Sequence, residues 1–165
     1  MRLAITADIH DNLANLEKSL NWFKNNGVEK IICVGDVTNL ETINFLAGNF
    51  TGEIFIIRGN ADNYKDNDLK TLSNINYLEE VGLVNIAGLS IGLCHEPEKI
   101  KRLKDLNKTS PDFIFYGHTH KPWLEKDGQT IIANPGTLGG IFYPATFAIL
   151  ETRNKNLELK RLDDL

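Results

Sequence analysis

The first sixty residues alternate between short apolar runs and stretches with helical spacing, and this order limits the folds that the chain can adopt. The runs are typical of buried strands and cover Leu3–Ala7, Lys30–Asp36 and Glu53–Asn60. Between them, apolar residues recur every three or four positions from Leu13 to Phe23, and a second helix is expected over Leu40–Ala47. This strand–helix–strand order predicts a parallel sheet with helices on its faces.

The second half of the chain has a pattern that is more typical of antiparallel strands. Two short strands are expected around Gly88, and Asp127-Gly128 is a typical hairpin turn. The segment 146–162 is expected to form a terminal hairpin. Together the halves predict a mixed α/β (α+β) architecture, in which two sheets form a sandwich with helices outside.

At 165 residues, the chain is expected to be one domain, residues 1–165, that buries a core without disulfide bonds. Its two cysteines, Cys33 and Cys94, lie in apolar runs, so we expect reduced, buried thiols and a cytoplasmic location. The net charge of −4 gives no signal for nucleic-acid binding. No apolar stretch has the length of a membrane span, and no signal peptide is expected.

Histidine, aspartate or asparagine follows each expected buried strand. These residues are Asp8, His10, Asp36, Asn60, His95, His118 and His120. In α/β sheets, ligands bind outside the carboxyl ends of the strands, so these seven side chains are expected at one edge of the structure. All four histidines of the chain belong to the set, which argues against scattered structural histidines and predicts a metal site.

The mixture of imidazole and oxygen ligands suits Mn²⁺, Fe²⁺, Co²⁺, Ni²⁺ or Zn²⁺ better than Mg²⁺ or Ca²⁺. Seven ligands are too many for one tetrahedral ion, and they suit two ions that share a carboxylate and leave positions for water and substrate. Two divalent ions beside two aspartates leave a surplus of positive charge. This surplus would attract an anion such as a phosphate ester, although the chain is acidic.

The order of these motifs resembles the calcineurin-like metallophosphoesterase superfamily, and in particular its small single-domain, YfcE-like phosphodiesterase branch. The motifs are D-x-H at Asp8, G-D at Asp36, G-N at Asn60, a strand-terminal histidine at His95 and "GHTHKPW" from Gly117, followed by "NPGT". The resemblance covers about residues 1–150. It implies a four-layer αββα sandwich of two mixed sheets flanked by helices, with a dinuclear metal centre.

The resemblance also divides the seven groups between two ions, of which Mn²⁺ is the first expectation. One ion would be held by Asp8, His10 and His120, the other by Asn60, His95 and His118, and both by Asp36. Asp36, Asn60 and His95 are predicted to be catalytic as well as metal-binding. The implied reaction is hydrolysis of a small phosphate ester, most naturally a diester, by in-line attack of a hydroxide held by the two ions.

Three positions bear on substrate and rate. Many family members carry a histidine after the asparagine of G-N, which protonates the leaving group, whereas this chain has Ala61. Because a general acid contributes about 10²–10⁴ in rate, we expect either a preference for esters with good leaving groups or protonation by a metal-bound water or the substrate. Glu96-Pro97 after His95 places a carboxylate beside the phosphate site. Arg58 is a candidate substrate-binding residue, and the alternative for it is an ion pair at a strand end.

A second class of function stays open at this point. The same fold serves as a protein-binding scaffold in the retromer coat, with a weakened metal centre. The complete set of seven candidate ligands favours the enzyme over the scaffold. Relatives are often dimers or larger, so the resemblance also allows for a homo-oligomer.

Overall fold

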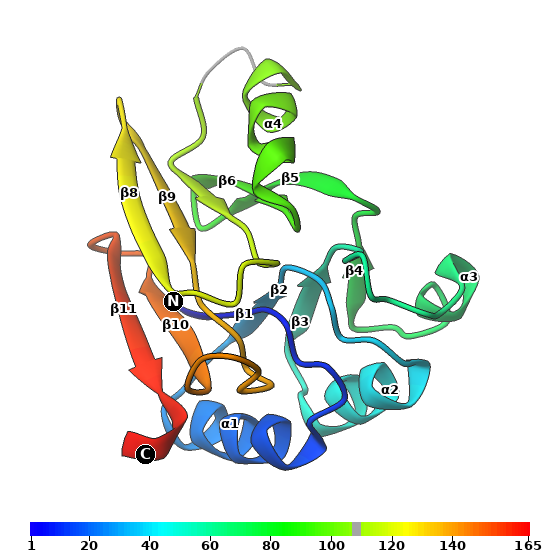
Figure 1. Ribbon diagram of the computed structural model, residues 1–165. Helices are drawn as coiled ribbons and strands as arrows, with labels where there is room; N and C mark the ends of the chain where they lie inside the picture. The colour runs from blue at the N-terminus through cyan, green and yellow to red at the C-terminus, as the bar shows by residue number, and fades with distance from the viewer. Residues whose placement is uncertain (107–109) are drawn as a thin grey trace.

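Two mixed β-sheets lie face to face and are covered by helices on both outer sides in the computed structural model, which describes residues 1–106 and 110–165 (Figure 1). The strand order is β11-β10-β1-β2-β3-β4 in the first sheet and β5-β6-β7-β9-β8 in the second. In chain order the elements are β1 (Arg2–Thr6), α1 (Leu13–Asn25), β2 (Lys30–Cys33), α2 (Leu40–Asn49), β3 (Glu53–Ile56), α3 (Asp66–Leu69), β4 (Ile75–Tyr77), β5 (Val81–Ile86), β6 (Leu89–Cys94), the 3₁₀ helix Pro97–Lys99, α4 (Ile100–Leu106), β7 (Phe113–Phe115), β8 (Trp123–Asp127), β9 (Thr130–Asn134), β10 (Thr146–Glu151), β11 (Asn156–Arg161) and the 3₁₀ helix Leu162–Asp164.

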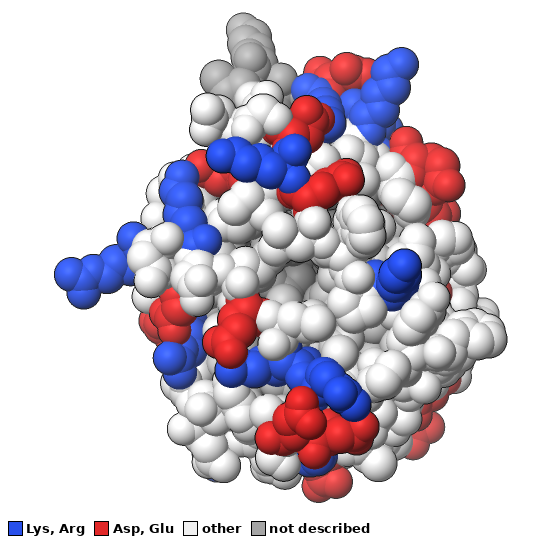
Figure 2. Space-filling model, turned by 60° about the vertical axis from the view of Figure 1, so that its left-hand side comes forward, with Lys and Arg blue, Asp and Glu red and all other residues white. Residues whose placement is uncertain are grey.

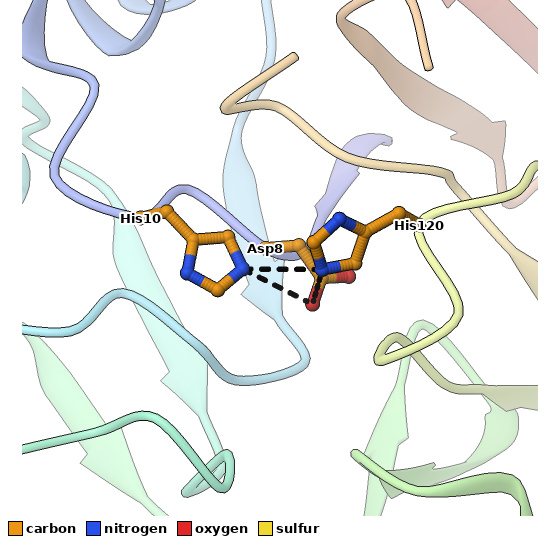
Figure 3. A group of neighbouring side chains, drawn as sticks. All are labelled: Asp8, His10 and His120. Carbon is orange, nitrogen blue, oxygen red and sulfur yellow. Dashed lines mark hydrogen bonds and ion pairs between the residues drawn. The ribbon is translucent and has the colours of Figure 1, made fainter. Parts of the chain in front are cut away.

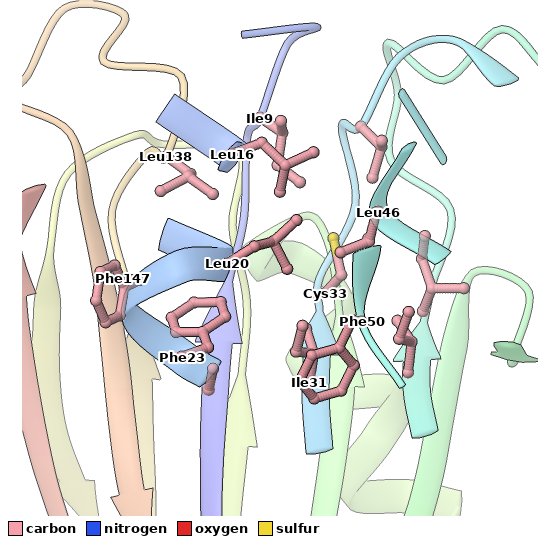
Figure 4. Close-up of a cluster of buried hydrophobic side chains, with 14 of the residues drawn as sticks. Ile9, Leu16, Leu20, Phe23, Ile31, Cys33, Leu46, Phe50, Leu138 and Phe147 are labelled. Atoms are coloured by element: carbon pink, nitrogen blue, oxygen red, sulfur yellow. The ribbon is translucent and has the colours of Figure 1, made fainter. Parts of the chain in front are cut away.

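Three groups of buried side chains correspond to the three contacts between four layers. The first lies between the first sheet and the helices α1 and α2, where Phe23 meets Phe147 edge to face at 4.9 Å between ring centroids (Figure 4). The second lies between the two sheets and contains Phe113 and Phe115. The third includes Leu103 of α4 and neighbouring residues of the second sheet. The predicted four-layer αββα sandwich is therefore confirmed.

The first strand holds the first sheet together. On one side β1 pairs in parallel with β2, and on the other it pairs antiparallel with β10, where Arg2 lies opposite Glu151. The predicted terminal hairpin is β10–β11, and the turn at Asp127-Gly128 joins β8 to β9. Contacts between residues far apart in the sequence therefore complete the sheet that carries the first three loops with predicted metal ligands.

The predicted strands end sooner than the apolar runs do. β2 ends at Cys33, because the chain then turns through Gly35 and Asp36, which have positive φ. β3 ends at Ile56. Two elements, α3 and β4, are not predicted by the sequence pattern. Both are four residues or fewer and lie in a polar stretch, where no period can be detected.

Both cysteines are free and buried, as predicted. Burial raises the pKa of each thiol to about 12, so neither is a reactive thiolate at neutral pH. Among the residues that the structure describes, no helix combines the length and the apolar composition needed to cross a bilayer.

The sandwich is open at one edge, between β8 of one sheet and β11 of the other. A groove of about 200 Å³ lies there, lined by Trp123, Leu124, Leu157 and Leu159 among others. Figure 2 brings this side of the molecule forward and shows a hollow with mostly uncharged side chains around it. None of the seven predicted metal ligands lines the groove.

We expect Phe115→Ala to lower the free energy of unfolding by about 3–5 kcal/mol, because Phe115 is completely buried and stacks on Phe113 between the sheets. The same change at Phe142, whose side chain is 89% exposed, is expected to cost less than about 0.5 kcal/mol. Urea denaturation of both variants measures the difference. Similar losses at the two positions would contradict the assigned core.

Candidate metal centre

All seven predicted ligand residues meet where the carboxyl ends of β1, β2, β3, β6 and β7 converge. Side-chain contacts of 3.4 Å or less join them into two groups. One group is His10, His120 and Asp8, and the other is Asp36, His95, Asn60 and His118. Contacts of 3.8 Å between His10 and Asp36 and of 4.0 Å between His95 and Asp8 connect the two groups. The structure thus brings together residues that are more than one hundred positions apart in the sequence.

The first group consists of Asp8, His10 and His120 (Figure 3). The Nε2 atoms of His10 and His120 are 3.2 Å apart, and Asp8 Oδ1 is 3.4 Å from His120 Nε2. Two imidazoles from different loops face each other across this short distance with a buried carboxylate beside them. Such convergence of lone pairs is what a shared cation would stabilise.

The second group is built around His95. Its Nε2 lies 3.3 Å from Asp36 Oδ2 and 3.0 Å from Asn60 Oδ1, and the same Asn60 oxygen lies 2.7 Å from His118 Nδ1. Asp36 Oδ2 is also 3.8 Å from His10 Nε2, so this carboxylate lies between the two groups. Asp8 and Asp36, with His95, form a set whose ligand atoms are within 4.8 Å of one another.

Backbone carbonyls orient two of the histidines. His95 Nδ1 is 2.8 Å from the Val34 carbonyl oxygen, and His120 Nδ1 is 3.2 Å from that of Ile141. A carbonyl can only accept, so each Nδ1 carries a hydrogen and each Nε2 points toward the cluster. In the neutral imidazole, Nε2 is then the nitrogen with the lone pair that could bind a metal.

Five of the seven residues have backbone conformations that side chains normally avoid. They are Asp8 (φ 52°), His10 (φ 47°), Asp36 (φ 54°), His118 (φ 67°) and His120 (φ 58°). A residue other than glycine in this region costs on the order of 1–3 kcal/mol and persists only where its surroundings hold it there. The left-handed turns bend the chain sharply after β1, β2 and β7, which aims these five side chains at a common region.

Glycines make room for the cluster. A Cβ on Gly59 would overlap Oδ1 and the backbone nitrogen of Asp36, and one on Gly117 would lie 2.9 Å from Asp8 Oδ2. The G-D, G-N and G-H motifs therefore contain glycine for steric reasons at the point where loops pass the buried carboxylates.

The electrostatics of the cluster are those of a site that lacks positive charge. Burial raises the pKa of Asp8 to about 7, and the neighbouring Asp36 acts in the same direction. Burial also opposes ionisation of Asp36, but its hydrogen bond to His95 and the charge of that residue outweigh this and lower the pKa of Asp36. Burial lowers the pKa of His10. Two divalent cations would reverse the penalty on Asp8, so the donor set and its charge fit the ions that the family implies.

Arg58 makes its contacts within its own loop. Its guanidinium forms an ion pair with Asp66 at 2.5 Å and donates to the carbonyls of Asp62 and Tyr64. These contacts support the alternative of a strand-end ion pair, and substrate binding by Arg58 stays a prediction. Glu96, the carboxylate next to His95, forms an ion pair with Lys99 at 2.7 Å, which offsets its charge.

Several supporting contacts are hard to infer from the sequence. Asn134 donates to the Gly117 carbonyl and to Thr119 Oγ1, and Thr137 Oγ1 donates to the Asp8 carbonyl. Asp62 accepts from the backbone N–H of Gly59 and Thr38. The turn motif "NPGT" was the one available signal for Asn134 and Thr137, whereas nothing local marks the carbonyls of Val34 and Ile141.

Comparison with known proteins gives consistent results. The family model described as "Calcineurin-like phosphoesterase superfamily domain" matches residues 1–155. Phosphodiesterase MJ0936 of Methanocaldococcus jannaschii is 28% identical, with 94% of this chain and 95% of the relative covered. Phosphodiesterase YfcE of Escherichia coli is also 28% identical, with coverage of 99% and 94%.

Solved structures show the same similarity. One of an archaeal phosphodiesterase has a TM-score of 0.87 and 26% identity, and the match covers 98% of this chain and 99% of that one. Vps29 of Entamoeba histolytica, solved in complex with zinc, has a TM-score of 0.70 and 18% identity, with 98% of both chains covered. At that identity the second match is evidence for the fold alone.

We expect Gly59→Ala to destabilise the protein by about 1–3 kcal/mol, because the added methyl group overlaps Asp36 and overpacked sites carry penalties of this size. Gly48→Ala is the matched control. Gly48 lies in α2 with no atom within 4 Å of an added Cβ, so this change is expected to be neutral or to stabilise by up to about 1 kcal/mol. Denaturant titration of both variants tests the close approach, which equal effects would contradict.

Proposed function

Because the chain belongs to the calcineurin-like phosphoesterase superfamily, a family of hydrolases that act on ester bonds, we propose that residues 1–165 form a single metal-dependent phosphodiesterase domain. The observation that carries this proposal is the convergence of seven nitrogen and oxygen donors on two adjacent positions. The phosphodiesterase names of two relatives that match almost the whole chain support the choice of a diester substrate.

In this proposal Asp8, His10 and His120 hold one divalent ion, and Asn60, His95 and His118 hold the other. Asp36 bridges them, which agrees with its place between His10 and His95. Mn²⁺ is the first candidate, and Fe²⁺, Co²⁺, Ni²⁺ and Zn²⁺ suit the same donors. When bound, such a pair lowers the pKa of water toward neutrality and stabilises charge on the phosphoryl oxygens during in-line hydrolysis.

The residues of the chain have separate tasks in this scheme. The Ala61 N–H donates to Asp36 Oδ1 at 2.8 Å, which leaves Oδ2 directed at the two imidazoles. The His118 N–H donates to both Asp8 oxygens and holds that carboxylate in place. Ala61 has no side-chain proton to give, so protonation of the leaving group would fall to a metal-bound water or to the substrate itself. We therefore propose that esters with acidic leaving groups are the best substrates.

We expect Asp36→Ala to reduce hydrolysis of bis(p-nitrophenyl) phosphate by about 10²-fold or more, because it removes the shared ligand and even residues that only orient ligands contribute 10–100-fold. Release of p-nitrophenol with Mn²⁺, Co²⁺ or Ni²⁺ measures the rate, and elemental analysis of the same samples measures bound metal. Glu158→Ala, an exposed carboxylate on β11, is the control and is expected to behave as wild type. If the wild-type protein has no activity with any of the ions, the scaffold alternative is favoured.

We expect Mn²⁺ to raise the melting temperature and EDTA to reverse the effect. A ligand at one hundred times its dissociation constant stabilises a protein by about 2.7 kcal/mol, which corresponds to roughly 5–10 °C for a chain of this size. Differential scanning fluorimetry measures the shift, and Asp8→Asn is expected to reduce it. An unchanged melting temperature over a range of ions would count against the metal centre itself, independently of catalysis.

A further inference from the structure

Exposed aromatic side chains gather beside the candidate metal centre. In the part of the chain that the structure describes, eight large hydrophobic side chains are exposed, and five of them come from positions 123–143. These five are Trp123, Leu124, Ile141, Phe142 and Tyr143. A cluster of exposed apolar groups is usually a binding surface, because exposure of apolar area to water is unfavourable and soluble proteins rarely leave such a patch without a partner.

Part of this surface forms a cavity that borders the centre. It has a volume of about 320 Å³ and is lined by Tyr116, Thr119, Lys121, Trp123 and Tyr143. Thr119 separates the predicted ligands His118 and His120 in the sequence, so the cavity wall and the metal centre share one loop. The cavity therefore begins one residue away from two of the predicted ligands.

Phe142 extends the aromatic surface to the centre. Its ring is 5.6 Å from that of His120, and its side chain is 89% exposed. Its φ of 65° is unusual for a bulky residue. The loop is held in place by Asn12, which donates to the Gly139 carbonyl, and by Asn15, which donates to the Leu138 carbonyl, each at 2.9 Å. The segment that leads to Phe142 is therefore tied to the start of α1, and the ring is exposed beside His120.

The chemistry of the lining indicates which group it would hold. Flat aromatic rings stack on nucleobases, with a contribution of about 1–3 kcal/mol per base. Lys121 Nζ lies 5.8 Å from the Trp123 ring and supplies a cation for phosphate or base carbonyls. The threonine hydroxyl and the ammonium group would lose hydrogen bonds to water against a lipid chain, whereas ribose and base edges can replace them. The volume is at the small end of the range of about 300–1,000 Å³ for ligand pockets and suits one nucleoside.

We propose that the cavity formed by Tyr116, Thr119, Lys121, Trp123 and Tyr143 is a subsite for the nucleoside arm of a phosphodiester substrate, with Phe142 as the ring between this arm and the metal centre. The assignment rests on the proposed phosphodiesterase function. It adds a substrate class, nucleoside phosphodiesters, and residues that determine specificity without taking part in bond cleavage.

Two esters with the same leaving group test the proposal. Thymidine 5′-(p-nitrophenyl phosphate) has a nucleoside arm, and methyl p-nitrophenyl phosphate has none. We expect Tyr143→Ala to lower kcat/KM for the nucleoside ester by about 5-fold to 100-fold, mainly through KM, and to change the methyl ester by less than about twofold. Tyr143→Phe keeps the ring and is expected to keep the preference. Leu159→Ala, an exposed apolar control that lines the other groove, is expected to affect neither ester.

A binding measurement separates failure of the subsite from failure of the enzyme. The chain has two tryptophans, so Trp22→Phe leaves Trp123 as the only indole. With and without Mn²⁺, thymidine 5′-monophosphate is expected to quench its fluorescence with saturation, and ribose 5-phosphate is not. Tyr143→Ala is expected to weaken the quenching by the nucleotide.

The outcomes are distinct. Equal losses on both esters, or no loss on either, would overturn the nucleoside assignment while leaving the phosphodiesterase in place. If the wild-type protein hydrolyses neither ester, the proposed function fails and the titration alone decides about the subsite. Saturable quenching by the nucleotide then supports it, and equal or absent quenching by the two phosphates overturns it.

Discussion

Two carboxylates buried next to each other are the constraint around which this structure is organised. Asp8 and Asp36 have almost no exposed surface, and both belong to a group of ligand atoms within 4.8 Å of one another. Like charges at this distance, away from water, oppose each other's ionisation. Backbone N–H groups of Ala61 and His118 and the imidazole of His95 offset part of this repulsion. A pair of cations is the counter-charge that would complete the balance, which is why the metal centre is the natural interpretation of the cluster.

Unfavourable backbone conformations accompany the convergence of these groups. Positive φ angles at five of the seven candidate ligands are unfavourable locally, and the surrounding layers must hold them. The buried residues on both sides of the first sheet do so, because the loops are short and their strands are fixed on two faces. The loop of Phe142 is similar, since Asn12 and Asn15 donate to the carbonyls of Gly139 and Leu138, and Phe142 has a positive φ and an exposed ring beside His120. The packing of the sheets and helices thus maintains the positions of the candidate ligands at the edge of the sheets.

The sequence was sufficient for the architecture and for the set of residues at the edge. Buried strands leave apolar runs, and the polar residue after each run is visible in one dimension, as at Asp36 and His95. Short polar elements such as β4 leave no period to detect. The carbonyls of Val34 and Ile141 carry no side-chain signal, so the tautomers of His95 and His120 could be read only in three dimensions. Arg58 illustrates the same limit, because its partner Asp66 lies in the helix α3 that the pattern did not predict.

The pairing of β1 with β10 has a consequence for folding during synthesis of the chain. Arg2 lies opposite Glu151, so β1 is synthesised well before the strand that completes its pairing. At roughly 5–20 residues per second, this delay is about 7–30 s. During that time the edge of β1 that faces β10 has no partner, because β2 pairs with the opposite edge. Pairing across so long a stretch of sequence is expected to slow folding of the first sheet.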